Sequence, residues 1–263
     1  MPEGDTVARH ADRLRPVLEG ERIVAVEGTA PSIRRGSNRI LDATVSGIRT
    51  VGKNLLIDLS TGYSIRVHLG MPGRWQISPT PEGHHGSARV VLVTSRGQAT
   101  CYAAPTVELD RTKRVEAGLE GIGPDLLGDF DEEEFVRRAR TRDDRSMAEM
   151  LLDQQVLAGI GNVYKSELLF LEGVHPETLV RQVDDERLRS MARRAGKLLA
   201  ANVRSGPRST TGSRVRGRET WVYGREGRPC RRCGHAIEMA KEGGRVTYWC
   251  PVCQPQPADS PGV

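Results

Sequence analysis

Four of the five cysteines of this chain occur as two C-x-x-C pairs, Cys230/Cys233 and Cys250/Cys253, with sixteen residues between the pairs. This spacing is typical of a four-thiolate zinc site, in which each pair forms a knuckle that supplies two corners of a tetrahedron. Between the pairs, Arg245–Trp249 has the composition of a strand, so we expect a β-hairpin that carries the metal. Because four thiolates leave no open coordination position, the pattern predicts one structural zinc ion per chain.

Two disulfides are the alternative interpretation of the same cysteines. The N-terminal residues Met1–Asp5 are acidic and contain no apolar stretch, so we expect no secretory signal and a reducing, cytoplasmic location. No run approaches the roughly 18 apolar residues that a membrane span needs, so no membrane partner is expected. The fifth cysteine, Cys101, lies in a β-type run and is expected to be a buried strand residue rather than a nucleophile.

Positive charge is concentrated near the cysteines. Residues 204–246 contain eleven Lys/Arg and four Glu, a local charge of +7, whereas the whole chain carries +5, which leaves −2 for the remainder. Such a block favours a polyanionic partner, with an ordinary solvated basic surface as the alternative. Within it, residues 204–219 are rich in Arg, Ser, Thr and Gly and are typical of a flexible linker or loop.

The N-terminal half combines one helix with many strands. Apolar residues at i, i+4, i+7 and i+11 from Val7 predict a helix that begins near Thr6 and stops at Gly20, with Pro16 kinking its last turn or ending it early. Short connectors such as Ser60–Gly62 predict hairpins, so the β-type runs that follow indicate a β-sandwich. These runs are Arg22–Val26, Thr44–Ile48, Leu55–Leu59, Tyr63–His68, Arg89–Thr94, Ala99–Ala103 and Val107–Leu109.

After a connector around residues 110–130 the pattern becomes helical. The clearest predicted helices are Arg145–Leu157, which Ser146 and Glu149 open with a capping box, Val163–Glu172, which Asn162 is suited to cap, and Asp184–Val203. The tight turn before Asn162 leaves backbone N–H groups that suit a phosphate, although an ordinary helical hairpin is the alternative. The chain is therefore expected to be an α+β multidomain protein, with boundaries at 1–120, 121–219 and 220–263.

One segment partly matches the P-loop motif that binds nucleotide phosphates. Residues 47–54, GIRTVGKN, nearly match G-x4-G-K-[ST], but Asn54 replaces the hydroxyl that binds magnesium, and Leu55–Leu59 predicts a strand rather than a helix. We therefore expect no nucleotide cofactor.

Four separated motifs together resemble the formamidopyrimidine-DNA glycosylase/endonuclease VIII family of bacterial base-excision-repair enzymes, over essentially the whole chain. The motifs are Pro2-Glu3-Gly4, Gly52-Lys53, the stretch from Leu152-Asp153-Gln154 through Gly159–Tyr164 to Glu167, and the finger that ends in Cys250–Gln254. The resemblance implies an N-terminal helix with a β-sandwich, a helix–two-turn–helix domain and a C-terminal zinc finger, with damaged DNA bound between the domains. It also implies a bifunctional glycosylase and AP lyase.

The resemblance assigns the chemistry to the N-terminus. Removal of Met1 would expose Pro2 as a secondary amine, about a quarter of which is unprotonated at pH 7.5, against about 0.1% of a free lysine. Pro2 would attack C1′ of the damaged nucleotide and form an iminium, and Glu3 would act as general acid. Lys53, Asn162 and Arg245 would hold phosphates, and Met71 would fill the space left by the flipped base.

Two features of the sequence bear on the lesion. The start Pro2-Glu3-Gly4 resembles the endonuclease VIII branch, and the Arg/Phe wedge of the oxidised-purine branch is missing from Ala103–Leu109, so oxidised pyrimidines are expected. Thr6 stands where many relatives carry a second Glu. The alternatives are an oxidised-purine (8-oxoguanine) glycosylase, a family member that binds lesions without cutting, and a non-catalytic zinc-ribbon DNA-binding protein. A monomer associated with the bacterial nucleoid is expected.

Overall fold

The computed structural model describes residues 2–83, 86–204, 207–242 and 244–257. The chain divides into two compact units, Met1–Gly121 and Ile122–Val263, and each unit has its own apolar core. The three-domain boundaries expected from the sequence stay a prediction. None of the described helices has the length and apolar character that a bilayer crossing requires.

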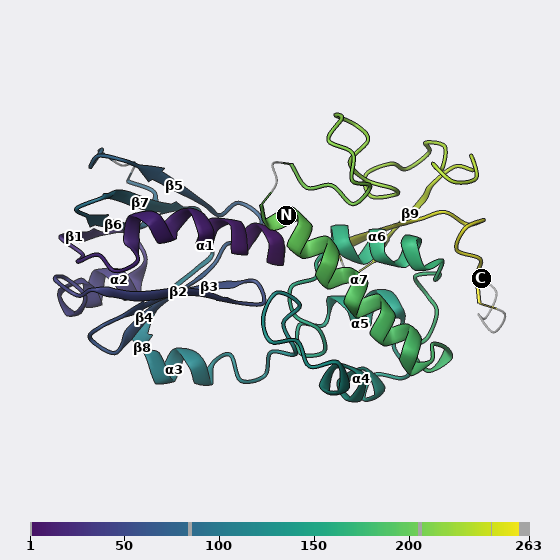
Figure 1. Ribbon diagram of the computed structural model, residues 1–263, viewed down its shortest axis with the longest axis horizontal. Coiled ribbons are helices and arrows are strands. Elements are labelled where there is room, and N and C mark those ends of the chain that lie inside the picture. Colours follow the sequence, from purple (N-terminus) through teal and green to yellow (C-terminus); the bar gives the residue numbers. More distant parts are fainter. Residues whose placement is uncertain (1, 84–85, 205–206, 243, 258–263) are drawn as a thin grey trace. The chain divides into compact units, whose positions relative to one another are not determined.

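Two four-stranded antiparallel sheets form the first unit (Figure 1). One sheet has the order β2-β3-β4-β8, with β2 Val45–Val51, β3 Asn54–Leu59, β4 Tyr63–His68 and β8 Thr106–Arg111. The other has the order β1-β6-β7-β5, with β1 Ala25–Glu27, β6 Ala88–Thr94, β7 Gly97–Tyr102 and β5 Arg74–Ser78. The cross-strand partners Ile57 and Ile65 are both fully buried, so this pair packs into the core of the unit. The predicted β-sandwich is confirmed.

Helix α1 (Gly4–Leu18) contacts β2 and β3 of one sheet and β5 and β7 of the other. The apolar face predicted for it is correct, since its four members are fully buried. Of the two outcomes expected from Pro16, a kink or an early end, the early end is wrong: the helix continues to Leu18, whose buried side chain anchors the last turn. Three short elements and one strand were not expected from the sequence: α2 (Pro31–Gly36), the 3₁₀ turn Ser37–Arg39, α3 (Thr112–Ala117) and β5.

The second unit is helical and ends in a hairpin (Figure 1). Its elements are α4 (Glu132–Arg140), α5 (Met147–Leu152), α6 (Asn162–Glu172), the 3₁₀ turn Val180–Gln182, α7 (Asp185–Val203), β9 (Glu238–Glu242) and β10 (Arg245–Trp249). The capping box of Ser146 and Glu149 is present. Two details differ from expectation: Gly161, not Asn162, caps α6, and α5 ends at Leu152 rather than Leu157.

The hairpin packs on α6 through a small core that contains Phe170, Val222 and Ile237 together with Cys230 and Cys250. The strand predicted at Arg245–Trp249 is confirmed and pairs with β9 from Arg245↔Glu242 to Trp249↔Glu238. The described part of the segment between α7 and the hairpin is a loop closed by hydrogen bonds, not a loose linker.

Candidate active site and metal centre

Pro2 and Glu3 stand at the beginning of α1. Glu3 is the N-cap residue, and its carbonyl oxygen accepts the first helical hydrogen bonds, from Thr6 N (2.9 Å) and Val7 N (3.1 Å). The Glu3 side chain is completely buried, whereas Pro2 is only partly buried. The Thr6 hydroxyl donates to the buried Asp5 carboxylate at 3.2 Å. A partly accessible proline therefore directly precedes a buried carboxyl group at the positive end of a helix.

Lys53 lies in a two-residue hairpin turn between β2 and β3. Val51 pairs with Asn54 across this turn, and Gly52 has a φ of 57°, a value that glycine adopts without strain. Asn54 also pairs with His68 at the end of β4. Burial, followed by the positive charges of Lys53 and Arg66, lowers the pKa of His68 below its usual value. The P-loop resemblance fails as expected, because a strand and not a helix follows Lys53.

Met71 is presented to solvent by a short loop between β4 and β5. Leu69, at the start of the loop, is 1% exposed, and its carbonyl accepts from Gly73 N at 2.9 Å. Met71 between them is 73% exposed. Core packing, the ordinary role of a methionine, is therefore excluded for Met71.

Side chains shape the turn between α5 and α6. Gln154 Nε2 donates to the carbonyls of Leu152 (3.2 Å) and Ile160 (3.0 Å), and Gln154 Oε1 accepts from Gly159 N at 3.1 Å. Gly159 has a φ of 102°, which a residue with a Cβ rarely adopts. These bonds replace the helical ladder after Leu152 and explain why α5 ends there. They lead the chain into α6, where Asn162 is the first helical residue and is 5% exposed.

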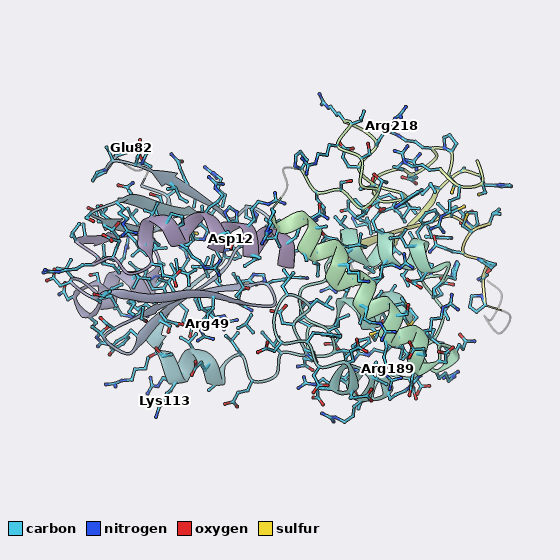
Figure 2. All side chains as sticks on the ribbon, in the orientation of Figure 1. Asp12, Arg49, Glu82, Lys113, Arg189 and Arg218 are labelled. Carbon is cyan, nitrogen blue, oxygen red and sulfur yellow. The ribbon has the colours of Figure 1, made fainter. Side chains whose placement is uncertain are left out.

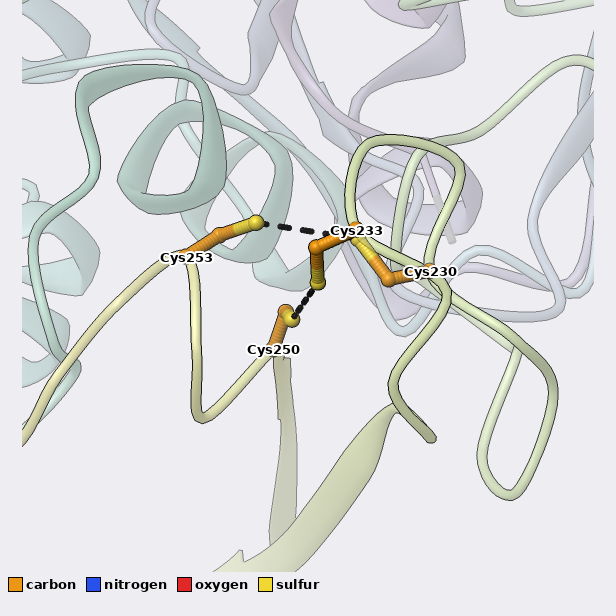
Figure 3. Close-up of side chains that lie close together, drawn as sticks. All are labelled: Cys230, Cys233, Cys250 and Cys253. Atoms are coloured by element: carbon orange, nitrogen blue, oxygen red, sulfur yellow. Dashed lines mark hydrogen bonds between the residues drawn. The ribbon is translucent and has the colours of Figure 1, made fainter.

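The four sulfur atoms of Cys230, Cys233, Cys250 and Cys253 lie within 4.8 Å of one another (Figure 3). Two of the separations are 3.4 Å, between Cys233 and Cys250, and 3.8 Å, between Cys230 and Cys253. A disulfide requires about 2.05 Å. In contrast, the corners of a tetrahedron with Zn–S bonds of about 2.3 Å are about 3.8 Å apart. The donor set fits one structural zinc ion.

The metal centre is tied to the helical part of its unit. Gln254 is fully buried; its Oε1 accepts from Cys250 N at 2.9 Å, and its Nε2 donates to the Val174 carbonyl at 2.8 Å. Lys165 on α6 is 1% exposed, and its ammonium group donates to the Val246 carbonyl (3.0 Å) and to Thr247 Oγ1 (2.7 Å). Arg245, the exposed first residue of β10, therefore directly precedes the two anchored residues Val246 and Thr247.

A groove of ≈ 760 Å³ opens beside this strand. It is lined by four basic residues and by two acidic ones, together with Gln154 and other residues of α5 and its following turn. The basic residues are Arg142, Arg145, Lys165 and Arg245, and the acidic ones are Glu149 and Asp153. Asp153 accepts from Arg142 Nε at 3.2 Å and lies 3.7 Å from Arg145 Nη1. The groove thus carries a net positive charge and matches a polyanion.

The expected residues are divided between the two units. The first unit contains Pro2, Glu3, Lys53 and Met71, and the second contains Asn162, Arg245 and the four cysteines. Sequence reasoning missed the structural roles of Gln154, Lys165 and Glu167. The sequence gives little indication of these roles, because a polar residue in a predicted helix does not reveal which distant backbone groups it hydrogen-bonds.

Cys101 in β7 is fully buried, as expected. Burial raises the pKa of its thiol to about 12, so it is not a thiolate nucleophile.

Three family models match consecutive parts of the chain: the formamidopyrimidine-DNA glycosylase N-terminal domain over residues 1–106, the H2TH domain of the same enzyme over 122–214, and the zinc finger found in FPG and IleRS over 227–256. The chain is 40% identical over its whole length to a probable endonuclease 8 2 of Streptomyces coelicolor, 97% of which it covers. It is 41% identical to a DNA-(apurinic or apyrimidinic site) lyase Nei2 of Mycolicibacterium smegmatis, over 97% of this chain and 99% of that protein.

Solved structures agree with these sequence matches. The formamidopyrimidine-DNA glycosylase of Lactococcus lactis, bound non-covalently to DNA that contains an AP site, superposes with a TM-score of 0.83 at 26% identity, over 97% of this chain and 100% of that one. The chain belongs to the formamidopyrimidine-DNA glycosylase/endonuclease VIII family. The fold and the zinc-finger module expected from the four motifs are therefore confirmed.

Proposed function

We propose that this protein is a bifunctional DNA glycosylase and AP lyase of base-excision repair that removes an oxidised base and then cuts the strand. The observation that carries the proposal is the placement of Pro2, partly accessible, next to the buried carboxyl group of Glu3 at the start of α1. Membership of the family and relatives named endonuclease 8 and AP lyase support it.

Pro2 is the proposed nucleophile. Once Met1 is removed, the secondary amine attacks C1′ of the damaged nucleotide, the C1′–base bond breaks, and the base leaves with a proton. The C1′–O4′ bond of the sugar then breaks, the ring oxygen takes up a proton, and an iminium forms whose positive charge is fixed because its nitrogen has no proton to lose. This charge draws electrons from C2′, so that loss of a C2′ proton expels the 3′ phosphate. The positive end of α1 disfavours a protonated amine at this place and so favours the nucleophilic form.

Glu3 is the proposed proton donor and acceptor. Its carboxyl group is buried and follows Pro2 directly in the chain, and it donates a proton to the sugar ring oxygen as the ring opens. The same group then accepts protons during the eliminations. Glu3 is therefore needed for base release and for proton transfer, and it does not contribute to DNA binding.

DNA contacts complete the proposal. Lys53 on its hairpin turn, Asn162 at the start of α6 and Arg245 on β10 are proposed to hold phosphates around the lesion, since all three present polar groups at the ends of elements. Met71, exposed on a firmly closed loop, is proposed to occupy the space left by the flipped nucleotide. The zinc ion supplies no chemistry: the four thiolates hold it to fix the hairpin that carries Arg245.

Oxidised pyrimidines are the proposed substrates. The Streptomyces and mycobacterial relatives named endonuclease 8 or Nei2 are 38–41% identical to this chain, whereas relatives named formamidopyrimidine-DNA glycosylase are 32–34% identical. This difference, together with the absent Arg/Phe wedge, supports the endonuclease VIII branch. We further propose a monomer that acts on the nucleoid in the bacterial cytoplasm.

A lesion panel tests the function. Duplexes with thymine glycol, dihydrouracil, 8-oxoguanine opposite cytosine, or a preformed abasic site are incubated with the purified protein, and base release and strand cleavage are measured separately. The expected result is release of the oxidised pyrimidines with cleavage at each abasic site. Preferred release of 8-oxoguanine would assign the purine branch. Binding without release or cleavage on every duplex would contradict an enzymatic function.

A further inference from the structure

The basic loop between α7 and the zinc finger is closed at its base. Thr210 N donates to the Glu219 carbonyl at 2.8 Å, and Thr211 Oγ1 donates to the Arg218 carbonyl at 2.6 Å. At the end of α7, Asn202 exchanges two hydrogen bonds of 2.8 Å with the backbone of Ser209. Residues 209–220, here termed the basic loop, therefore form a hydrogen-bonded unit rather than a loose connection.

The base of the loop is held by a buried anion. Glu167 on α6 is fully buried, and its carboxylate accepts from the backbone amides of Trp221 (2.7 Å), Val222 (2.8 Å) and Tyr223 (2.8 Å) and from the Thr210 hydroxyl. Hydrogen bonds to a carboxylate are stronger than those between neutral groups.

A second anchor comes from the zinc finger. Arg231 Nη2 donates to the Gly217 carbonyl at 2.7 Å, and Arg231 Nε donates to the Thr220 carbonyl at 3.0 Å. Helix α6 and the first zinc knuckle thus hold the loop from two sides.

The tip presents positive charge that the described residues do not neutralise. Arg214, Arg216 and Arg218 are exposed, and within the described ranges no acidic side chain pairs with any of them; Figure 2 shows Arg218 on this loop. In contrast, Arg189 on α7 is bound by Glu133, with both nitrogen–oxygen distances at 3.0 Å. With Glu219 as its one acidic residue, the basic loop carries a charge of 3 − 1 = +2. A fixed loop that concentrates unpaired guanidinium groups matches a polyanion at a small entropic cost.

We propose that the tip of the basic loop is an additional binding site for the DNA backbone, in which Arg214 and Arg216 contact phosphates without reading bases. This inference rests on the proposed function, which identifies the polyanionic partner as DNA. It goes beyond the contacts proposed for Lys53, Asn162 and Arg245, which surround the lesion. Guanidinium groups bind phosphate oxygens in pairs, and such contacts position DNA independently of sequence.

Salt dependence of binding tests the proposal. The dissociation constant is measured between 50 and 200 mM salt for a lesion-free duplex and for a duplex with a tetrahydrofuran abasic analogue. The test variant is Arg214→Gln/Arg216→Gln. The matched control is Arg34→Gln/Arg35→Gln, which removes the same charge from two exposed arginines of α2 in the first unit. Zinc content and the melting temperature show that both variants are folded.

The expected result is a slope of log K against log salt that is shallower by about 2 for the loop variant on both duplexes, with the control unchanged. Affinity at low salt is expected to fall about tenfold. A wild-type slope would overturn the proposal, as would an equal loss in the control or a loss confined to the lesion duplex. Weakened binding of RNA with unchanged binding of duplex DNA would also overturn it. A changed slope in a protein that releases no base would refute the proposed activity but not this contact.

Discussion

Lys165 on α6 and Val246 on β10 are joined by a hydrogen bond of 3.0 Å from the ammonium group to the backbone carbonyl. The same ammonium group donates to Thr247 Oγ1 at 2.7 Å, and the Lys165 side chain is 1% exposed. A buried charge is costly unless it is paired with strong acceptors, so its presence here fixes β10 against the helix. Arg245 is the residue before this attachment point, and its position therefore depends on α6 as well as on zinc.

Replacing Lys165 by methionine tests this dependence. Lys165→Met keeps most of the side chain's volume but leaves the Val246 carbonyl without its donor, at a cost of about 1–3 kcal/mol. We expect DNA affinity to fall about tenfold while one zinc ion stays bound, as measured by fluorescence anisotropy and metal analysis. Lys197→Met, on the exposed surface of α7, is the control. Unchanged DNA affinity in Lys165→Met would show that Arg245 does not need this anchor.

Removing one thiolate should destabilise the zinc finger of the second unit and leave the first unit folded. Cys250→Ser is expected to lose the zinc ion, and with it the core shared by Phe170, Val222 and Ile237, because metal binding supplies most of the stability of such a small module. DNA affinity should fall with the zinc content, whereas the β-sandwich of the first unit keeps its far-ultraviolet signal. Stoichiometric zinc in the purified variant would argue against a four-thiolate site.

Acid should destabilise the first unit through His10. Burial, and then the positive charges of Arg13 and Arg9, lower the pKa of His10 to about 4, against 6.5 in an unfolded chain. Between these values the unfolded state binds a proton that the folded state does not, so stability falls as pH decreases from about 6.5 to about 4. His10→Gln should unfold with a weaker pH dependence than the wild type in this window, in urea titrations at pH 7 and pH 5. The exposed His235→Gln is the control, and an equal pH dependence in wild type and His10→Gln would refute the assignment.

Glu3→Gln separates base release from cleavage. The amide cannot donate a proton to the sugar ring oxygen, so release of an oxidised pyrimidine should fall by about 10²-fold or more. At a preformed abasic site no base has to leave, and strand cleavage should be retained in part. The two rates are measured on the same duplex context, with zinc content and melting temperature as controls for folding. Equal losses on both substrates would remove Glu3 from the base-release step.

Local patterns were sufficient for much of the fold. The buried face of α1, seven of the eight strand segments of the sandwich and the knuckles of the finger follow from residues near in sequence, and these were predicted correctly. β5 was missed because Arg74–Ser78 is short and follows Pro72-Gly73, which favours a turn. The predicted length of α5 was too great. The Gln154 side chain hydrogen-bonds backbone groups beyond Leu152 that would be paired with one another in a longer helix.

Contacts between residues far apart in the chain could not be predicted from the sequence. Glu167 meets Trp221–Tyr223 more than fifty residues later, and Lys165 meets Val246 about eighty residues later. Nothing in the local composition of either segment indicates these partners. The basic loop illustrates the consequence: its composition predicts flexibility, whereas distant buried groups hold its base.

The identity of the nucleophile tests the account most directly. The protein is incubated with a duplex that contains an abasic site, the covalent intermediate is reduced with borohydride, and the cross-linked peptide is mapped by mass spectrometry. We predict one DNA adduct per chain, on the nitrogen of Pro2 in a peptide that has lost Met1. An adduct on Lys53 or another lysine, or cleavage without any reducible intermediate, would contradict the proposed mechanism.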